Sequence, residues 1–465
     1  MRLKSYIGDK AFYRRVLLIA IPIILQNVIT SSVAMVDNLM VGKLSTAEIS
    51  AVTIVNNNLL FIFNLCLFGG NSSAEIFITQ FFGSDDHDGI RYAFRCKTII
   101  SLVICGIGIA IFLLFRDPLI GLYLQGDGDA QVAADTLKCS REYMFIMLVG
   151  LLPFALTNAY AGTMRSCSQP MVPMLAGFAA MFVNIVLNYV LIFGNFGAPP
   201  MGVAGAAIAT VISRYVEFAI VVIWSHMNSG KLPFVKGLYR SLYIPASLLK
   251  AIAKKGLPLI INETMWSLGT AFLNQCYSVC GLDVVPALSI SSTIQNFAGI
   301  SFRSMGATIS IIIGQKLGSG CSEWEARDVY RKLTALSVVF CTCFGIAMAA
   351  LSGWFPKNYN TTAEIQGIAT GLILINSACM IIRGYDFPVY FTLRAGGKTG
   401  LAAIYDCCYV WVVQVSLAFI LSRFTNLHVF PIFAICNGVD ILKCVLGGWL
   451  IKKGSWIQNL AGKRA

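Results

Sequence analysis

Twelve continuous apolar runs, each about as long as one membrane-spanning helix, follow one another along the 465-residue chain. A bilayer core about 30 Å thick requires about 20 apolar residues per helix. Continuous runs exclude β-strands as the spanning elements, because barrel strands alternate apolar and polar residues. The chain is therefore predicted to be an all-α polytopic membrane protein with twelve transmembrane helices. The runs are Val16–Val36, Ala51–Phe68 with an extension toward Phe82, Thr98–Phe115, Tyr143–Met164, Met171–Phe193, Val203–Trp224, Pro258–Val279, Ala287–Ile313, Leu333–Trp354, Gly367–Leu393, Leu401–Leu421 and Val429–Leu450.

The composition supports this class of protein. Hydrophobic residues make up 57% of the chain and charged residues only 12%, against about 45–50% and about 25% in soluble domains. So few charges cannot cover the surfaces of soluble domains of this total length. An ordinary soluble enzyme, a disordered chain and a nucleic-acid-binding protein are thereby excluded.

Lys and Arg residues predict the orientation and the domain boundaries. With the N-terminus inside, 25 of the 35 lie on the inner side, 6 on the outer side and 4 within spans. Cytoplasmic loops carry such an excess, so both termini are predicted to be cytoplasmic. The basic segment 228–255 is the predicted cytoplasmic linker between an N-lobe (1–227) and a C-lobe (256–450), and 451–465 is a cytoplasmic tail.

The two halves resemble each other in sequence. Six helices per half make the halves parallel repeats, and two such lobes suit alternating access by a secondary transporter. The repeated features are Pro22 with Gln26-Asn27 and Pro258 with Asn262-Glu263; Ile49-Ser50 with Asn57 and Leu288-Ser289 with Asn296; Gln80 with Gly83-Ser84 and Gln315 with Gly318-Ser319; and Arg165 and Arg394.

Motifs for ATP and metal chemistry are missing from the sequence. There is no GxxxxGK[ST] phosphate loop and no HExxH, and the three histidines are scattered. The chain is therefore predicted not to be an enzyme and to need no cofactor.

Asp37 is the charge within the spans that most strongly suggests a function. A charge at the bilayer centre costs roughly 2.5–3.5 kcal/mol, and Asp37 has no basic residue within one helical turn. We predict an ion-binding role, the alternative being an acid at the lipid–water interface. Pro22 on the same helix removes a backbone hydrogen bond, which predicts either a hinge or a static packing kink.

Three charged residues of the second half are further candidates. Glu263 lies one turn beyond Pro258 without a local cation, so it is either functional or an interfacial acid. Asp386 is either functional or neutralised by Arg383 one turn away. Arg303 has no local partner, and Glu263 or Asp386 is its candidate partner across the lobe.

Other polar residues occur in pairs at helical spacing. Arg214 with Glu217, and Asp440 with Lys443, are spaced i,i+3 and are expected to neutralise each other. Asn184 and Asn188 are spaced i,i+4 and face the same way, where amide oxygens either coordinate a hard cation or hydrogen-bond between helices.

These features together resemble the multidrug and toxic compound extrusion (MATE) family over nearly the whole chain. The stretches that carry the resemblance are Val36-Asp37 through Val41-Gly42, NIVLNYVLIFG leading to MGVAGAAIAT (Asn184–Thr210), IIIGQKLGSG (Ile311–Gly320), LRAGGKTG (Leu393–Gly400) and the ending Asp440 to Trp456.

The resemblance implies two six-helix lobes in a V shape that export organic, often cationic compounds in exchange for Na⁺ or H⁺. Asp37 matches the family's acid on the first helix, and Asn184, Asn188 and Thr210 match its partners on the fifth and sixth helices. The resemblance implies an acid or Asn at position 188, which is Asn in this chain. In the C-lobe, Glu263 matches a coupling acid, whereas Asp386 is displaced by about one turn.

A site with one carboxylate, two amides and a hydroxyl favours Na⁺ over H⁺, because a second acid would hold a proton more readily. We thus expect an antiporter with a small organic substrate, working as a monomer in a bacterial cytoplasmic (inner) membrane and binding no nucleic acid. The alternatives are a flippase for lipids or lipid-linked sugars and, more remotely, a membrane-embedded transferase.

Overall fold

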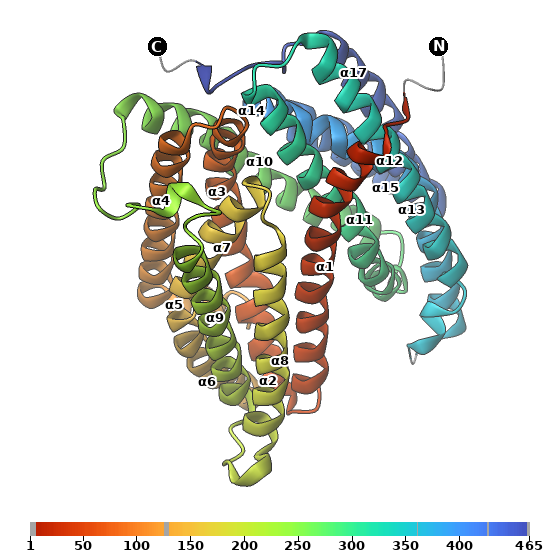
Figure 1. Ribbon diagram of the computed structural model, residues 1–465. Helices are drawn as coiled ribbons and strands as arrows, with labels where there is room; N and C mark the ends of the chain where they lie inside the picture. Colours follow the sequence, from red (N-terminus) through yellow and green to blue (C-terminus); the bar gives the residue numbers. More distant parts are fainter. Residues whose placement is uncertain (1–5, 125–129, 360, 426, 463–465) are drawn as a thin grey trace. The chain divides into compact units, whose positions relative to one another are not determined.

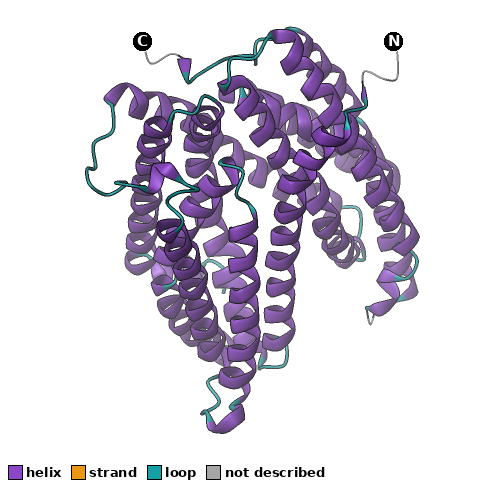
Figure 2. Ribbon diagram, viewed as in Figure 1, coloured by secondary structure: helices purple, strands orange, loops and turns teal. Residues whose placement is uncertain are grey.

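The chain folds almost entirely into helices. The computed structural model describes residues 6–124, 130–359, 361–425 and 427–462, and among these residues there is no strand (Figure 2). Each predicted apolar run lies mostly on helical residues, and the run Met171–Phe193 has the same bounds as the observed helix. The outermost residues of the predicted cytoplasmic tail, 463–465, lie outside the described residues. The prediction of an all-α membrane fold is confirmed.

The helices follow one another with short connections (Figure 1). In the first half they are α1 (Lys10–Val41), α2 (Thr46–Val52), η2 (Thr53–Leu59), α3 (Leu60–Gly83), α4 (His87–Leu114), α5 (Arg116–Gly121), α6 (Ala130–Val149), α7 (Leu151–Ser166), α8 (Met171–Phe193), η3 (Asn195–Gly197), α9 (Gly202–Met227) and η4 (Pro233–Val235). In the second half they are α10 (Ala246–Ser278), α11 (Val284–Gly318), α12 (Glu323–Leu351), η5 (Phe355–Asn358), α13 (Ala363–Ala395), α14 (Thr399–Ala403), η6 (Ile404–Cys408), η7 (Val410–Val415), α15 (Ser416–Phe424), α16 (Val429–Gly438) and α17 (Asp440–Lys452).

Most of these helices are suited to cross a bilayer. Ten helical segments of the described residues are long and apolar enough, and α6 with α7 adds an eleventh if this bent pair is one span. The remaining predicted run, Pro258–Val279, lies on α10, which is long enough but is not among the ten. Polar residues such as Asn262 and Glu263 lower its hydropathy.

Several spans are less regular than the sequence suggested. The run Tyr143–Met164 is not one straight helix, because α6 and α7 meet at Gly150 with a bend of 44°. The second span contains the π-helix η2, and the eleventh contains the π-helices η6 and η7. π-Helical turns within α-helices frequently mark functional sites.

The chain divides into two compact units. Unit 1 contains residues 1–24, 79–86 and 257–465, and unit 2 contains residues 25–78 and 87–256. Helix α1 therefore contributes its first part to unit 1 and its second part to unit 2. The change occurs between Ile24 and Leu25, two residues after Pro22.

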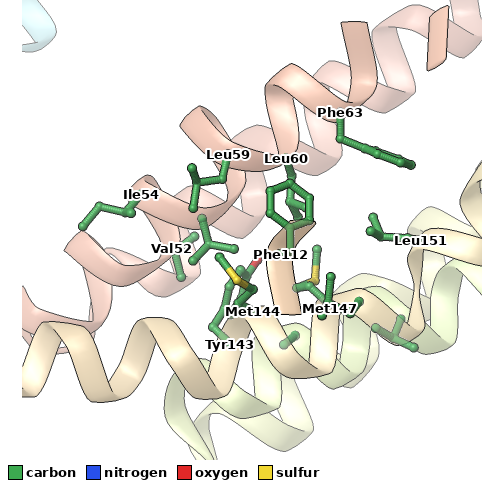
Figure 3. Packing of buried hydrophobic residues seen from close by; sticks show 14 of the residues in the cluster. Val52, Ile54, Leu59, Leu60, Phe63, Phe112, Tyr143, Met144, Met147 and Leu151 are labelled. Carbon is green, nitrogen blue, oxygen red and sulfur yellow. The ribbon is translucent and has the colours of Figure 1, made fainter. Parts of the chain in front are cut away.

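The core of unit 2 forms where the second span packs on α6. Figure 3 shows buried side chains of η2 and α3 beside those of α6. Ala51, Ala155 and Ala207 are fully buried, and such small residues let helices approach closely, which stabilises packing in lipid. This arrangement holds α6 in place against its neighbours. The labelled residues are Val52, Ile54, Leu59, Leu60, Phe63, Phe112, Tyr143, Met144, Met147 and Leu151.

In unit 1, the ends of α3 and α11 cross at two glycines that the internal repeat places at equivalent positions. A Cβ at Gly83 would meet the backbone of Gln315, and a Cβ at Gly318 would meet the backbone of Gln80. The Gln80 side chain donates to Ala395 O (2.8 Å) and accepts from Leu460 N (2.7 Å). The crossing therefore also anchors the segment that follows α17.

Substituting Gly318 by alanine is expected to destabilise this crossing. The new methyl group meets backbone rather than a flexible side chain, and overpacking of this kind costs about 1–3 kcal/mol. The measurement is the thermal unfolding temperature of the purified chain in detergent. Gly106→Ala on α4 is the matched control, because nothing lies within 4 Å of a Cβ built there. Equal unfolding temperatures for the two variants would contradict the close crossing.

Candidate functional site

The four residues predicted to bind an ion in the first half lie in one hydrogen-bonded chain. Asn188 Nδ2 donates to Asp37 Oδ1 (2.5 Å) and lies 3.2 Å from Asn184 Oδ1. Asn184 Nδ2 lies 3.5 Å from Thr210 Oγ1. Residues from α1, α8 and α9, up to 173 positions apart in the chain, thus form a single cluster within unit 2.

The hairpin of α8 and α9 brings three of these residues together. Helix α8 ends at Gly194, which adopts a left-handed conformation (φ 73°) that glycine accommodates without strain. Met201 N then donates to Leu191 O (2.9 Å), which brings the start of α9 back to the end of α8. Helices α8 and α9 run side by side (Figure 1), so Thr210 faces Asn184.

The two asparagines of the cluster are deeply buried, Asp37 and Thr210 are half-buried, and the cluster is rich in oxygen. Asn184 is 1% exposed and Asn188 is fully buried. Asn188 Oδ1 has no hydrogen-bond partner among the described residues. A buried polar atom without a partner costs free energy, and a bound cation is one way to satisfy an oxygen. The carboxylate of Asp37, two amide oxygens and the Thr210 hydroxyl make a donor set suited to a hard cation.

Two neighbours of this cluster were not predicted as site residues. Tyr143 on α6 is buried and interacts electrostatically with Asp37 and with Arg214. Arg214 on α9 stacks over the Phe154 ring (4.7 Å from Arg214 Cζ to the ring centroid) and acts on the Asp37 charge. Arg214 was expected to be neutralised by Glu217. In the structure it interacts electrostatically with Asp37 as well as with Glu217. The sequence signal that could have identified Arg214 as a neighbour of the site is its position one helical turn beyond Thr210 on α9.

In the second half, Glu263 on α10 belongs to a network of polar side chains. Its Oε1 accepts from Tyr390 OH (3.4 Å) and lies 3.8 Å from Arg394 Nη1. The neighbouring Asn262 donates to Tyr390 OH (3.0 Å) and to Asp406 Oδ2 (3.2 Å). Glu263 is therefore paired within unit 1.

Asp386 is paired with a residue that the sequence assigned elsewhere. Lys443 Nζ contacts Asp386 Oδ2 (3.0 Å) and Asp406 Oδ1 (2.9 Å). The direct ion pair of Asp386 is therefore with Lys443 and not with Arg383, which acts on Asp386 through its charge only. Lys443 likewise acts on Asp440 through its charge and makes its direct contacts with the other two acids. Asp440 instead accepts from Gln414 (2.8 Å). Neighbouring helices supply the nearest partners, and helical spacing alone carries no information about them.

Arg303 does not pair with either of its expected partners. It donates to Asn296 O (3.0 Å) on its own helix α11, whereas Glu263 lies beside Arg394 and Asp386 beside Lys443. Arg383 Nη2 donates to Asn376 Oδ1 (3.1 Å). The structure therefore brings Glu263 and Asp386 into one polar region and leaves Arg303 outside it.

The two halves use their repeated residues in the same way. Arg165 at the end of α7 donates to Gln26 Oε1 (3.0 Å) on α1. Arg394 at the end of α13 lies beside Glu263 on α10, one residue beyond Asn262, which the repeat matches with Gln26. This equivalence of contacts supports the internal repeat.

Comparisons with known proteins agree with this architecture. The sequence model of the MatE family matches residues 22–190 and 258–420, one match in each half. The probable multidrug resistance protein NorM of Thermotoga maritima is 22% identical over 88% of this chain and 85% of its own. The probable multidrug resistance protein YoeA of Bacillus subtilis is 24% identical over 90% of this chain and 89% of its own.

A solved structure has the same fold. It is described as the crystal structure of MATE in the bent conformation, and it matches with a TM-score of 0.85 at 17% identity. The match covers 99% of both chains.

Proposed function

Because this chain belongs to the MATE family of multidrug efflux transporters, we propose that it is a secondary antiporter that exports organic, often cationic compounds in exchange for Na⁺. It is a transporter and not an enzyme. The single observation that carries the choice of ion is the oxygen cluster at Asp37, with one carboxylate and the buried, unpartnered Asn188 Oδ1 among the described residues. One negative charge with neutral oxygen ligands matches a monovalent hard cation.

The coupling step is a charge effect at Asp37. A Na⁺ that enters from outside neutralises the carboxylate and draws the oxygens of Asn188, Asn184 and Thr210 toward itself. This changes the contacts of α1 with α8, because Asp37 and Asn188 are hydrogen-bonded. Pro22 supports a bend in α1, since it removes a backbone hydrogen bond two residues before the helix passes from unit 1 to unit 2. Alternating access results when the Na⁺-bound and the substrate-bound protein each change between the outward-facing and the inward-facing conformation.

We further propose that the protein works as a monomer in a bacterial cytoplasmic membrane with both termini inside. The NorM and YoeA relatives support a bacterial setting. The excess of Lys and Arg in the loops on one side supports the orientation.

Efflux of a fluorescent monovalent cation from proteoliposomes tests the function. An inward Na⁺ gradient is expected to drive efflux, whereas an inward H⁺ gradient of equal size is not. Exchange of one Na⁺ for one monovalent cation moves no net charge. An imposed membrane potential, worth about 2.3 kcal/mol per charge per 100 mV, should then leave the rate unchanged.

Three results would contradict parts of this proposal. Efflux driven only by H⁺ would overturn the choice of ion. A rate that follows the membrane potential would overturn one-for-one exchange. No efflux under any gradient would favour a narrow-substrate exporter or a flippase, to be tested with labelled lipid-linked substrates.

A further inference from the structure

The second half holds a buried ammonium group between two carboxylates. Lys443 on α17 has a side chain that is 6% exposed. Its Nζ lies 3.0 Å from Asp386 Oδ2 on α13 and 2.9 Å from Asp406 Oδ1 on η6. The three charged groups come from three different helical segments of unit 1. Charged side chains at membrane depth are costly and usually mark function.

The surrounding groups hold the carboxylates in place. Tyr405 OH donates to Asp386 Oδ1 (2.6 Å), and Asn262 Nδ2 donates to Asp406 Oδ2 (3.2 Å). The ammonium also lies over the ring of Tyr405, 5.0 Å from its centroid. Tyr405 and Asp406 both belong to the π-helix η6. The wider turn of a π-helix redirects side chains, and such turns recur at functional sites.

We propose that the Lys443 side chain is a built-in counter-cation, which fills the cation position of the second half so that this half binds no coupling ion. This inference rests on the proposed function, because it sets how many ions are exchanged. Two ionised carboxylates that face one nitrogen repel each other, and a positive charge between them removes that repulsion. A covalently attached ammonium supplies that charge and cannot be exchanged across the membrane.

The geometry indicates what the site would bind if the ammonium were absent. Asn262 is 1% exposed, and its Oδ1 has no hydrogen-bond partner among the described residues. With Lys443 shortened, the carboxylates of Asp386 and Asp406 and the hydroxyl of Tyr405 remain around the vacated position, and Asn262 contacts Asp406 through its amide group. Such a set of oxygen ligands suits a hard cation. Lys443 thus suppresses a second Na⁺ site rather than merely packing in the core.

Calorimetric titration of the purified full chain with NaCl tests this inference. The titration is done at a pH high enough to keep both carboxyl groups ionised, because two neighbouring acids otherwise share a proton. We then expect about one bound Na⁺ per chain in the wild type and about two in Lys443→Met, because the substitution removes the competing ammonium. In the double variant Asp37→Asn with Lys443→Met, about one should remain. Lys443→Arg is the matched control, since it keeps the positive charge and should gain no site.

The outcomes separate this inference from the proposed function. Failure of Asp37→Asn to reduce Na⁺ binding would contradict the Asp37 site, whereas a gain in Lys443→Met would still support the counter-cation. A Lys443→Met variant that folds and binds no additional Na⁺ overturns the inference. If that variant does not fold, Asp386→Asn in the otherwise unchanged chain decides. If the wild type binds about two Na⁺ and Asp386→Asn binds one fewer, the inference is overturned. If both proteins bind about one Na⁺, the inference is supported.

Discussion

Asp37→Asn is expected to abolish Na⁺-driven efflux while leaving the protein folded. The substitution removes the one carboxylate of the cluster and keeps a side chain of nearly the same shape beside Asn188. Interactions with a charged partner contribute about 1.5–3 kcal/mol, so Na⁺ affinity should fall about 10- to 100-fold. The measurements are dye efflux under an inward Na⁺ gradient and Na⁺ binding to the purified chain.

The matched control for this variant is Asp283→Asn. Asp283 is exposed at the start of α11, and its side chain makes no capping hydrogen bond. It should transport like the wild type, which separates the effect of the site from a general loss of negative charge. Unchanged Na⁺-driven efflux in Asp37→Asn would contradict the proposed coupling mechanism.

Asn188→Asp is expected to change the coupling ion from Na⁺ to H⁺. The amide that donates to Asp37 at 2.5 Å becomes a second carboxyl group at the same place. Two carboxylates this close cannot both ionise readily, so one proton is held between them. Efflux should then follow an inward H⁺ gradient, and its rate under an inward Na⁺ gradient should fall about tenfold or more.

A double variant provides the control for this change. Asp37→Asn with Asn188→Asp exchanges the two side chains and restores a single carboxylate opposite an amide. Na⁺-driven efflux should return at least in part, because the charge and the number of oxygen ligands are those of the wild type. Persistent Na⁺ coupling in Asn188→Asp alone would show that the number of acids does not select the ion.

The N-terminal cluster could be predicted largely because its residues lie close in sequence or in a recognisable motif. Asn184 and Asn188 share a helix face by their spacing, Asp37 is a charge within a span without a basic residue one turn away, and the resemblance to a known family added Thr210. Spacing carried no information on Tyr143, whose place beside Asp37 depends on how α6 packs in unit 2.

The second half shows the limit of local rules more clearly. Sequence spacing paired Lys443 with Asp440 on one helix face, but the ammonium contacts Asp386 and Asp406 from two other helical segments. The lysine side chain is long enough to place its ammonium group across a helix interface. A buried ammonium without a carboxylate partner is strongly destabilising, so it pairs with acids on neighbouring helices. Arg303 was assigned a partner across the lobe because it has no charged partner nearby in sequence, but it bonds to a backbone carbonyl of its own helix instead.

The sequence by itself determined the membrane class, the helices and their approximate bounds. The length and continuity of an apolar run are local properties, and the thickness of the bilayer core sets the length that a spanning helix requires. It also determined which acids needed an explanation. Only the tertiary structure decided how those acids are paired, where the spans bend and where π-helical turns interrupt them. These features arise from contacts between helices that are distant in the chain, and the energies of such contacts depend on packing that no local pattern encodes.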